Sequence, residues 1–532
     1  MTGETSKKRS LGSIAGIVAV ATLVSKLFGL VREQLIAAAF GVGTIVDAYS
    51  YAYVIPGFLL ILLGGINGPF HSALVSALAK RDKSEAAPIV ETVTTLVTVA
   101  LFIVTIVLII FAETFIDLIA PGLSAEVRSM AVLQLQIMSP VAMLAGLIGI
   151  GFGTLNAADS YLLPSLSPLF SSVTIVVTMA CLLWQVGDKL NTPQYLTTGA
   201  IALAGATLAG AVLQWLAQLV AQWREGMGRL KLRFDWRISG VSDVLKVMLP
   251  ATLSSGMLQI NVYTDLFFAS SIAGAAAAMR YANFIALTPL GIISNTILVP
   301  FFPVFSRLAA PENWAELKLR IRQVLFLTAL TMLPLTAIFI SLGLPIVRLV
   351  YQRSQFNANA ALQVAPLLMV YGLGLLFYLA RDVLVRVFYA LGDGETPFRI
   401  SIANIFLNAL LDYLLVNAFA APGLVMATIG VNTISMFVFL WLLNKRLNGL
   451  PLLQWSKYLV GLLIATILAT GASYGTSQLW ESYLDSTGLL LILELGICSA
   501  IALIVFFSAT LPLKLPEMSM LTEKVKAKVM RR

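Results

Sequence analysis

The stretch TVTTLVTVALFIVTIVLIIF, residues 92–111, holds 20 consecutive residues without a charge. An α-helix rises about 1.5 Å per residue, so a helix of this length crosses a bilayer hydrocarbon core of about 30 Å. The stretch therefore predicts a membrane-spanning helix. Similar apolar runs recur along the whole chain, so the bilayer is the expected solvent of the fold.

The composition agrees with an all-α polytopic membrane protein. The 532 residues are 59% hydrophobic and 11% charged, and the mean hydropathy is +0.90. These values exclude a soluble domain with a single core. About 14 transmembrane helices are predicted, over residues 14–40, 46–70, 90–111, 130–156, 162–184, 197–221, 245–270, 278–305, 323–347, 362–391, 398–418, 422–443, 457–476 and 488–511.

The basic residues predict the orientation of these spans. If the N-terminus is cytoplasmic, the loops on its side and the two termini hold 26 of the 35 Lys and Arg residues, and the opposite loops hold four. The positive-inside rule then places both termini in the cytoplasm, in a multi-pass protein of the cytoplasmic (inner) membrane. Because this topology accounts for the net charge of +9, no nucleic-acid partner is expected.

An internal repeat divides the spans into two halves. FGTLNAADSYLLP at 152–164 and FYALGDGETP at 388–397 each combine a helix end, an acidic turn and a proline. We expect two six-helix lobes related as parallel repeats, followed by two C-terminal helices. The predicted domains are an N-terminal lobe at 1–222, a basic cytoplasmic linker at 223–246, a C-terminal lobe at 247–444, and the last two helices with a basic tail at 445–532.

Charged residues inside the first span are the first candidates for a binding site. A charge at mid-membrane costs about 2.5–3.5 kcal/mol on insertion scales, so it usually faces a cavity or a partner. In VSKLFGLVRE, Lys26, Gly29 and Glu33 lie at i, i+3 and i+7, and Arg32 extends the same flank. We interpret this flank as a cationic cavity wall for an anionic substrate. The alternative is that Arg32 and Glu33 lie near a helix end, where they reach the interface or pair with each other.

Two further charges open later spans. Asp47 follows the Gly41–Gly43 turn at the start of the second span, where it either caps the helix or faces the cavity. Arg280 opens the eighth span, and either anchors it at the interface or faces the cavity.

The second half holds a cluster of oxygen-bearing side chains. Asn404, Asn408 and Asp412 are spaced i, i+4 and i+8, which places them on one helix face. Thr428 follows on the next span, and Asp265 lies inside the seventh. Such oxygen donors suit a hard cation, whereas the alternative is a hydrogen-bonded polar seam between helices. With one histidine and two cysteines in the chain, no transition-metal site is expected.

The residues at 25–49, 296–308 and 386–397 resemble the MurJ/MviN family of lipid II flippases, within the multidrug, oligosaccharidyl-lipid and polysaccharide exporter superfamily. The stretch SKLFGLVREQLIAAAFGVGTIVDAY carries the most specific part of the likeness. The resemblance implies two lobes around a central cavity and a groove for the lipid tail between the last two helices. It also implies a transporter that is not an enzyme and needs no cofactor, apart from Na⁺ as a coupling ion.

The family's headgroup residues are carried over with two departures. Lys26 replaces the first family arginine, Arg32 retains the second, Glu33 is the acidic neighbour, and Asp47 is the aspartate of the second span. The family's arginines in the second and eighth spans align near Leu60 and Phe284. Arg280 lies four residues before Phe284, hence on the same helix face, and is the candidate substitute. The family's sodium site corresponds to Asp265, Asn408, Asp412 and Thr428, with the carbonyl of Leu424 as a further ligand.

The expected function is therefore translocation of lipid II, the undecaprenyl-diphosphate-linked peptidoglycan precursor, from the inner to the outer leaflet by alternating access. We expect a monomer that meets membrane lipids and cell-wall synthesis proteins. The alternative is a flippase for another polyprenyl-linked oligosaccharide, and a multidrug exporter is less favoured because the first span is cationic. A membrane glycosyltransferase would need acids or bases on a substantial outer loop, and a silent scaffold would not need charges in its spans.

Overall fold

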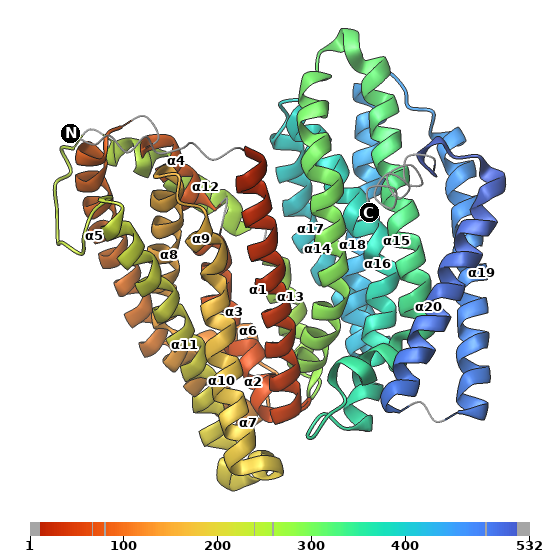
Figure 1. Cartoon of the computed structure of the whole chain (residues 1–532), viewed down its shortest axis with the longest axis horizontal. Coiled ribbons are helices and arrows are strands. Elements are labelled where there is room, and N and C mark those ends of the chain that lie inside the picture. The colour runs from red at the N-terminus through yellow and green to blue at the C-terminus, as the bar shows by residue number, and fades with distance from the viewer. Residues whose placement is uncertain are drawn as a thin grey trace. The chain divides into compact units, whose positions relative to one another are not determined.

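The computed structural model describes residues 11–65, 68–78, 81–238, 240–257, 260–484 and 487–518. Over these ranges the chain forms α-helices joined by turns, short 3₁₀ helices and one longer irregular connection, and no strand is found there (Figure 1). The prediction of an all-α fold is confirmed.

The helices of the N-terminal half follow the predicted spans closely. They are α1 (Leu11–Phe40), α2 (Thr44–Ala52), α3 (Val54–Gly64), α4 (Pro69–Leu78), α5 (Lys83–Ile110), α6 (Ala112–Ile119), α7 (Ala125–Met138), α8 (Pro140–Ala157), α9 (Leu162–Leu166), α10 (Pro168–Val186) and α11 (Pro193–Arg224). A 3₁₀ helix, η1 (Gly187–Asn191), joins α10 to α11.

The C-terminal half is built from longer, less interrupted helices. They are α12 (Val241–Met257), α13 (Ile260–Ala269), α14 (Ala275–Arg307), α15 (Trp314–Tyr351), α16 (Ala358–Ala390), α17 (Glu395–Phe419), α18 (Ala421–Arg446), α19 (Leu452–Tyr483) and α20 (Gly488–Thr510). The 3₁₀ helices η2 (Pro311–Asn313) and η3 (Leu511–Leu513) precede α15 and follow α20.

The helices have the length and composition of a multi-pass membrane protein. Within the described ranges, 12 helical segments are long and apolar enough to cross a membrane. The remaining two of the 14 predicted spans coincide with α1 and with α12 followed by α13. Several predicted spans, such as the second and the fourth, are built from consecutive helices rather than one, because turns interrupt them at Tyr53 and Ser139.

The α8 helix forms the centre of the N-terminal half. Its residues from Val141 to Leu155 are almost all buried, and it packs against α3, α4, α5 and α11. Glycine makes this packing close, because a Cβ atom at Gly149 would stand only 1.9 Å from the carbonyl oxygen of Leu63. Small residues at helix crossings are the usual means by which membrane helices approach each other.

Two compact units make up the chain. The first contains residues 1–277 and 353–356, and the second contains residues 278–352 and 357–532. The predicted linker at 223–246 includes the connection from α11 to α12, but the first unit continues beyond it, because α12 packs against α3, α4 and α5. The predicted lobes, as bodies that move against each other, stay a prediction.

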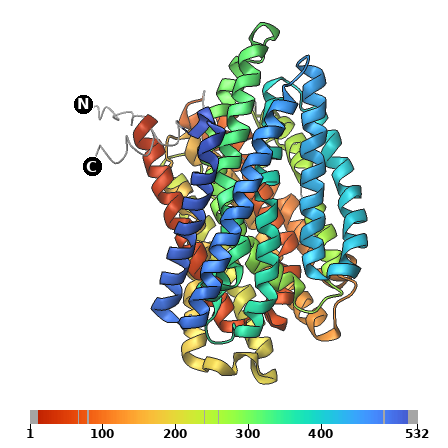
Figure 2. The same cartoon turned by 90° about the vertical axis from the view of Figure 1, so that its right-hand side faces the viewer.

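The last two helices form an antiparallel pair within the second unit. In Figures 1 and 2, α19 and α20 run side by side in blue, and both pack against α15. Buried polar contacts join these helices, since Ser341 Oγ lies 2.9 Å from Ser473 Oγ and Ser477 Oγ donates to Glu494 Oε1 at 2.6 Å. A groove for a lipid tail along this pair stays a prediction.

Candidate functional site

The cationic flank of α1 contains one exposed charge and one ion pair. The Lys26 side chain is exposed. Arg32 donates to Glu33 Oε1 from Nη2 at 2.8 Å and from Nε at 3.1 Å, while 26% of the Arg32 side chain and 2% of the Glu33 side chain remain exposed. The pairing considered from the sequence is therefore present. It orients the guanidinium of Arg32 and leaves part of it available to an anion.

Asp47 is held by backbone groups from a distant part of the sequence. Its Oδ2 accepts a hydrogen bond from the Gly274 N–H and its Oδ1 accepts one from the Ala277 N–H, both at 3.1 Å. These groups belong to the first turn of α14, so the carboxylate caps that helix and complements its dipole. The sequence left two roles open for Asp47, a cap at the start of its own span or a position facing the cavity, whereas the structure shows a cap on a helix more than 200 residues later.

The first turn of α14 also positions Arg280. This residue follows Ala277 by three positions and is half-buried. Phe284, where the resemblance places an arginine, is half-buried one turn further along the same helix. Leu60, the other departure, is half-buried on α3. A contact between any of these positions and a headgroup stays a prediction.

The α17 helix reverses the usual distribution of polar and apolar side chains. Apart from Pro397, the residues that it buries are Asn404, Asn408 and Asp412, while Phe406 and Tyr413 are exposed. The three polar side chains lie on one face, as their spacing predicts. A membrane helix that turns its polar face inward and its apolar face outward satisfies the polar groups within the protein and leaves the other face for lipid.

Hydrogen bonds connect this polar face to the neighbouring helix. Asn408 Nδ2 donates to Asp412 Oδ2 at 2.8 Å, and Ser435 Oγ of α18 donates to Asn404 Oδ1 at 2.7 Å. Further along α18, Asn432 Nδ2 donates to the Thr428 carbonyl at 2.7 Å. The Ser435–Asn404 bond crosses from α18 to α17, whereas the other two bonds each lie within one helix. We call this group of polar side chains on the two helices the seam.

Sequence reasoning did not include three of the residues that complete this seam. Ser435 and Asn432 lie on the same face of α18 as Thr428, and Arg381 Nη1 of α16 donates to Asn432 Oδ1 at 3.3 Å. The spacing of Thr428, Asn432 and Ser435, at i, i+4 and i+7, was the signal that could have identified the two α18 residues.

The chemistry of this region fits a hard cation. Asp412 is fully buried and Asn408 is 1% exposed, so a carboxylate and the carboxamide that donates to it lie away from bulk water. Leu424 is fully buried on α18, and Thr428 is half-buried one turn after it. Asp265, the remaining predicted ligand, is half-buried on α13, a helix of the first compact unit. Carboxylate, amide, hydroxyl and carbonyl oxygens are donors that Na⁺ accepts, as other hard cations do.

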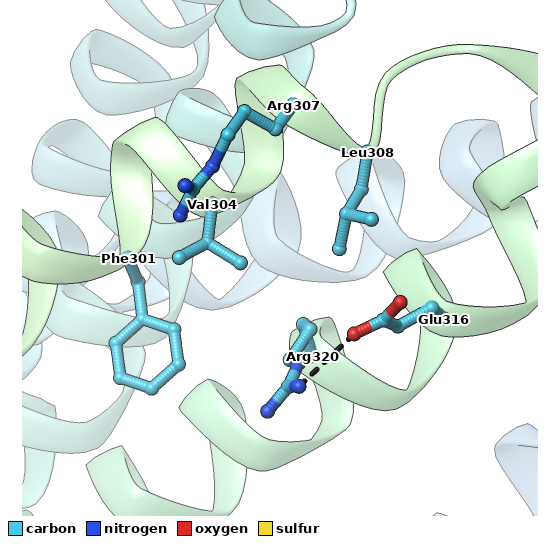
Figure 3. Close-up of a pocket in the computed structure, with 6 residues that line it drawn as sticks. All are labelled: Phe301, Val304, Arg307, Leu308, Glu316 and Arg320. Carbon is cyan, nitrogen blue, oxygen red and sulfur yellow. Dashed lines mark hydrogen bonds and ion pairs between the residues drawn. The ribbon is translucent and has the colours of Figure 1, made fainter.

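A separate cavity of about 430 Å³ opens between the end of α14 and the start of α15 (Figure 3). Arg320 Nη2 donates to Glu316 Oε1 at 3.0 Å on its wall. None of the residues predicted for headgroup or cation binding lines this cavity. The lining residues are Phe301, Val304, Arg307, Leu308, Glu316 and Arg320.

Comparison with known proteins places this architecture in one family. The family described as "Lipid II flippase MurJ" matches residues 36–494. A protein of Synechocystis sp. named "Probable lipid II flippase MurJ" is 62% identical over 518 residues, which cover 97% of each chain. A protein of Burkholderia cenocepacia named "Lipid II flippase MurJ" is 29% identical over 87% of this chain and 89% of its own.

Solved structures share the fold. A structure described as "Lipid II flippase MurJ, inward closed conformation" matches with a TM-score of 0.74 and 22% identity, covering 92% of this chain and 98% of that chain. An inward-facing multidrug resistance MATE family transporter of the MOP superfamily matches with a TM-score of 0.62 and 16% identity, over 81% and 98% of the two chains. Since the family match extends over most of the sequence and the Synechocystis protein is similar over nearly all of it, the chain belongs to the MurJ family of lipid II flippases.

Proposed function

We propose that this protein translocates lipid II from the inner to the outer leaflet of the cytoplasmic membrane by alternating access. The observation that carries the proposal is the 62% identity to a probable lipid II flippase over 97% of both chains, because identity at this level extends to both compact units. The protein acts as a transporter and forms no covalent intermediate with its cargo. It works as a monomer with both termini in the cytoplasm, and cell-wall synthesis proteins are its expected partners.

The diphosphate of the cargo pairs with the cationic flank of α1. Lys26 supplies an exposed ammonium group, and Arg32 presents the part of its guanidinium that Glu33 does not cover. A guanidinium fits phosphate geometry through parallel N–H donors. In this mechanism Glu33 orients Arg32, Asp47 holds the first turn of α14 in place, and Arg280 is a further cation of that helix.

The seam between α17 and α18 supplies the proposed coupling site. Asn408, Asp412, Thr428 and the Leu424 carbonyl are the proposed ligands of Na⁺, with Asp265 as the further ligand that the resemblance implies, and Na⁺ binding favours one conformation over the other. Movement of a single charge through the membrane field supplies about 2.3 kcal/mol per 100 mV, enough to bias a conformational equilibrium. The buried Asp412 carboxylate then alternates between a bound cation and hydrogen-bonded neighbours.

The comparisons name lipid II and do not favour a second cargo, but the chain departs from the family pattern at two positions. Leu60 and Phe284 stand where arginines are expected, so the headgroup has fewer cationic contacts than the resemblance implies. A different polyprenyl-linked oligosaccharide, with the same diphosphate and another sugar, is the alternative cargo that the experiment below distinguishes from lipid II.

A depletion experiment tests the cargo. The chain is expressed in a bacterium whose own lipid II flippase is depleted, and growth and cell shape are followed alongside a Lys457→Ala variant, which removes an exposed charge outside the proposed site. Rescue by both proteins is expected. Failure to rescue, with normal amounts of protein in the membrane, assigns the transport to another polyprenyl-linked oligosaccharide.

A further inference from the structure

The connection from α11 to α12 exposes a regular pattern of large apolar side chains. The connector is defined here as residues 229–237, with the sequence RLKLRFDWR. Its Leu230, Leu232, Phe234 and Trp236 side chains are 67%, 80%, 58% and 64% exposed. Basic residues and one aspartate alternate with them in the sequence. Residues 231–235 lie between a bend at Leu230 and a turn at Trp236 and Arg237, and over an extended stretch this alternation puts apolar groups and charges on opposite sides.

Contacts with α5 hold the connector in place. The Arg229 N–H donates to Glu91 Oε1 at 3.2 Å, and Arg233 Nη1 lies 3.4 Å from Glu91 Oε2. The Arg233 N–H also donates to Thr95 Oγ1 at 3.1 Å. Figure 1 shows the connector in yellow-green beside α5. The exposed apolar side chains are therefore presented by a chain with defined contacts.

The attachment point lies at the edge of the hydrocarbon core. The α5 helix has 28 residues, about 42 Å of length, of which the hydrocarbon core covers about 30 Å, or about 20 residues. The uncharged stretch at 92–111 has that length, so Glu91 is the last charged residue before the acyl chains begin. The connector contacts α5 at Glu91 and Thr95, which is the depth of the lipid headgroups and the first acyl carbons.

Side chains at this depth match the chemistry of an anionic bilayer surface. Tryptophan and other amphipathic residues concentrate at membrane interfaces, and basic residues beside them reach the lipid phosphates. Arg229, Lys231 and Arg237 are exposed, and with Asp235 and the partly buried Arg233 they leave the connector strongly basic. Large exposed apolar patches on a protein usually mark an interaction site.

We propose that the connector is an interfacial anchor that binds anionic phospholipids. Leu230, Leu232, Phe234 and Trp236 enter the boundary between headgroups and acyl chains, while Arg229, Lys231 and Arg237 bind lipid phosphates. Glu91 and Thr95 fix the connector at the required depth. The inference does not depend on which cargo the protein translocates.

Spin labels on single cysteines test the position of the two faces. In the full chain with Cys181→Ser and Cys498→Ala, labels are placed by Leu232→Cys, Trp236→Cys or Asp235→Cys. The proteins are reconstituted in phosphatidylcholine vesicles with or without phosphatidylglycerol, and collisions with oxygen and with a water-soluble nickel chelate are measured. In phosphatidylglycerol vesicles, the labels at 232 and 236 should collide mainly with oxygen and the label at 235 mainly with the chelate.

Charge removal tests the lipid selectivity. One basic residue near an anionic surface changes binding by about fivefold, so Lys231→Gln with Arg237→Gln should lower the docked-to-undocked ratio about thirtyfold in phosphatidylglycerol vesicles. The control, Lys457→Gln with Lys514→Gln, changes two exposed lysines elsewhere and should have no effect.

Two results overturn the proposal. If labels at 232 and 236 meet the nickel chelate as often as the label at 235 in both kinds of vesicle, the apolar face is not in lipid and instead awaits a protein partner. If the labels are equally protected with and without phosphatidylglycerol, the connector does not select anionic lipids.

Discussion

Replacing Asp47 should destabilise the first compact unit, because the carboxylate caps the first turn of α14. The side chain is 3% exposed and accepts hydrogen bonds from the N–H groups of Gly274 and Ala277. Asp47→Ala leaves both donors without this acceptor. Asp47→Asn retains one neutral acceptor and should lose about half as much stability.

The expected size follows from the two charged hydrogen bonds. Each is worth about 1.5–3 kcal/mol, so Asp47→Ala costs about 3–6 kcal/mol. The first unit contains residues 1–277 and 353–356 and is therefore larger than 250 residues, so about 2 °C per kcal/mol applies, and the apparent Tm should fall by about 6–12 °C. The control is Asp117→Ala, which removes an exposed carboxylate paired with Arg128 and should change stability by less than about 1 kcal/mol.

Thermal unfolding of the purified protein in detergent, followed by intrinsic fluorescence, measures these shifts. If the Asp47 carboxylate caps α14, Asp47→Ala should lower Tm the most, Asp47→Asn less, and Asp117→Ala the least. If Asp47→Ala and Asp47→Asn both melt within about 1 °C of the unchanged protein, the hydrogen bonds to α14 do not stabilise the fold and this reasoning is refuted.

Three other predictions follow from named contacts. Sodium chloride at 100 times the dissociation constant of Na⁺ should stabilise the protein by about 2.7 kcal/mol relative to potassium chloride at equal ionic strength, which appears as a higher Tm. Asp412→Asn should remove this difference in Tm between the two salts. An equal Tm of the unchanged protein in both salts would contradict the sodium site. Gly149→Ala should lower expression and Tm because its Cβ would stand 1.9 Å from the Leu63 carbonyl oxygen. The control, Gly205→Ala on α11, has open space around it and should be neutral or slightly stabilising. Equal effects of the two substitutions would disprove the close approach of α8 and α3. Burial alone would raise the pKa of Asp393, but hydrogen bonds from Thr396 and the Arg446 guanidinium lower that pKa overall. The resulting contribution to stability is therefore present above the ordinary pKa of about 4 and is lost as pH falls through the lower pKa of the folded protein. Asp393→Asn should flatten this acid dependence of Tm, and an unchanged slope of Tm against pH would count against the contact.

The helices and the polar face of α17 could be predicted from the sequence because both depend on local periodicity. Uncharged runs of bilayer length give the spans, and a spacing of i, i+4 and i+8 places Asn404, Asn408 and Asp412 together on any helix. The same reasoning could have added Asn432 and Ser435 to the seam. It could not add Arg381 to the hydrogen-bond network, since that contact depends on how α16 packs against α18.

Other features depend on residues that are distant in the sequence. Nothing near Asp47 indicates that its partners are Gly274 and Ala277, because the hydrogen bonds form only when α2 and the start of α14 are packed together. For the same reason the sequence does not indicate that α12 packs within the first unit, nor that residues 353–356 belong to it. The alternation of apolar and charged residues in the connector is visible in the sequence, but the exposure of the apolar side chains and the attachment of the connector to Glu91 require the structure.

The measurement that tests the central claim most directly is translocation of fluorescent lipid II by the purified protein in sealed vesicles. A membrane-impermeant quencher reports how fast the labelled lipid changes leaflet, with Arg32→Ala, Arg32→Lys and Lys457→Ala compared at equal protein content. Loss of a charged hydrogen bond worth about 1.5–3 kcal/mol should slow Arg32→Ala by about 10- to 150-fold, with partial recovery in Arg32→Lys and no change in Lys457→Ala. Translocation at the unchanged rate in Arg32→Ala would contradict the cationic site on α1, and no translocation by the unchanged protein would contradict the proposed function.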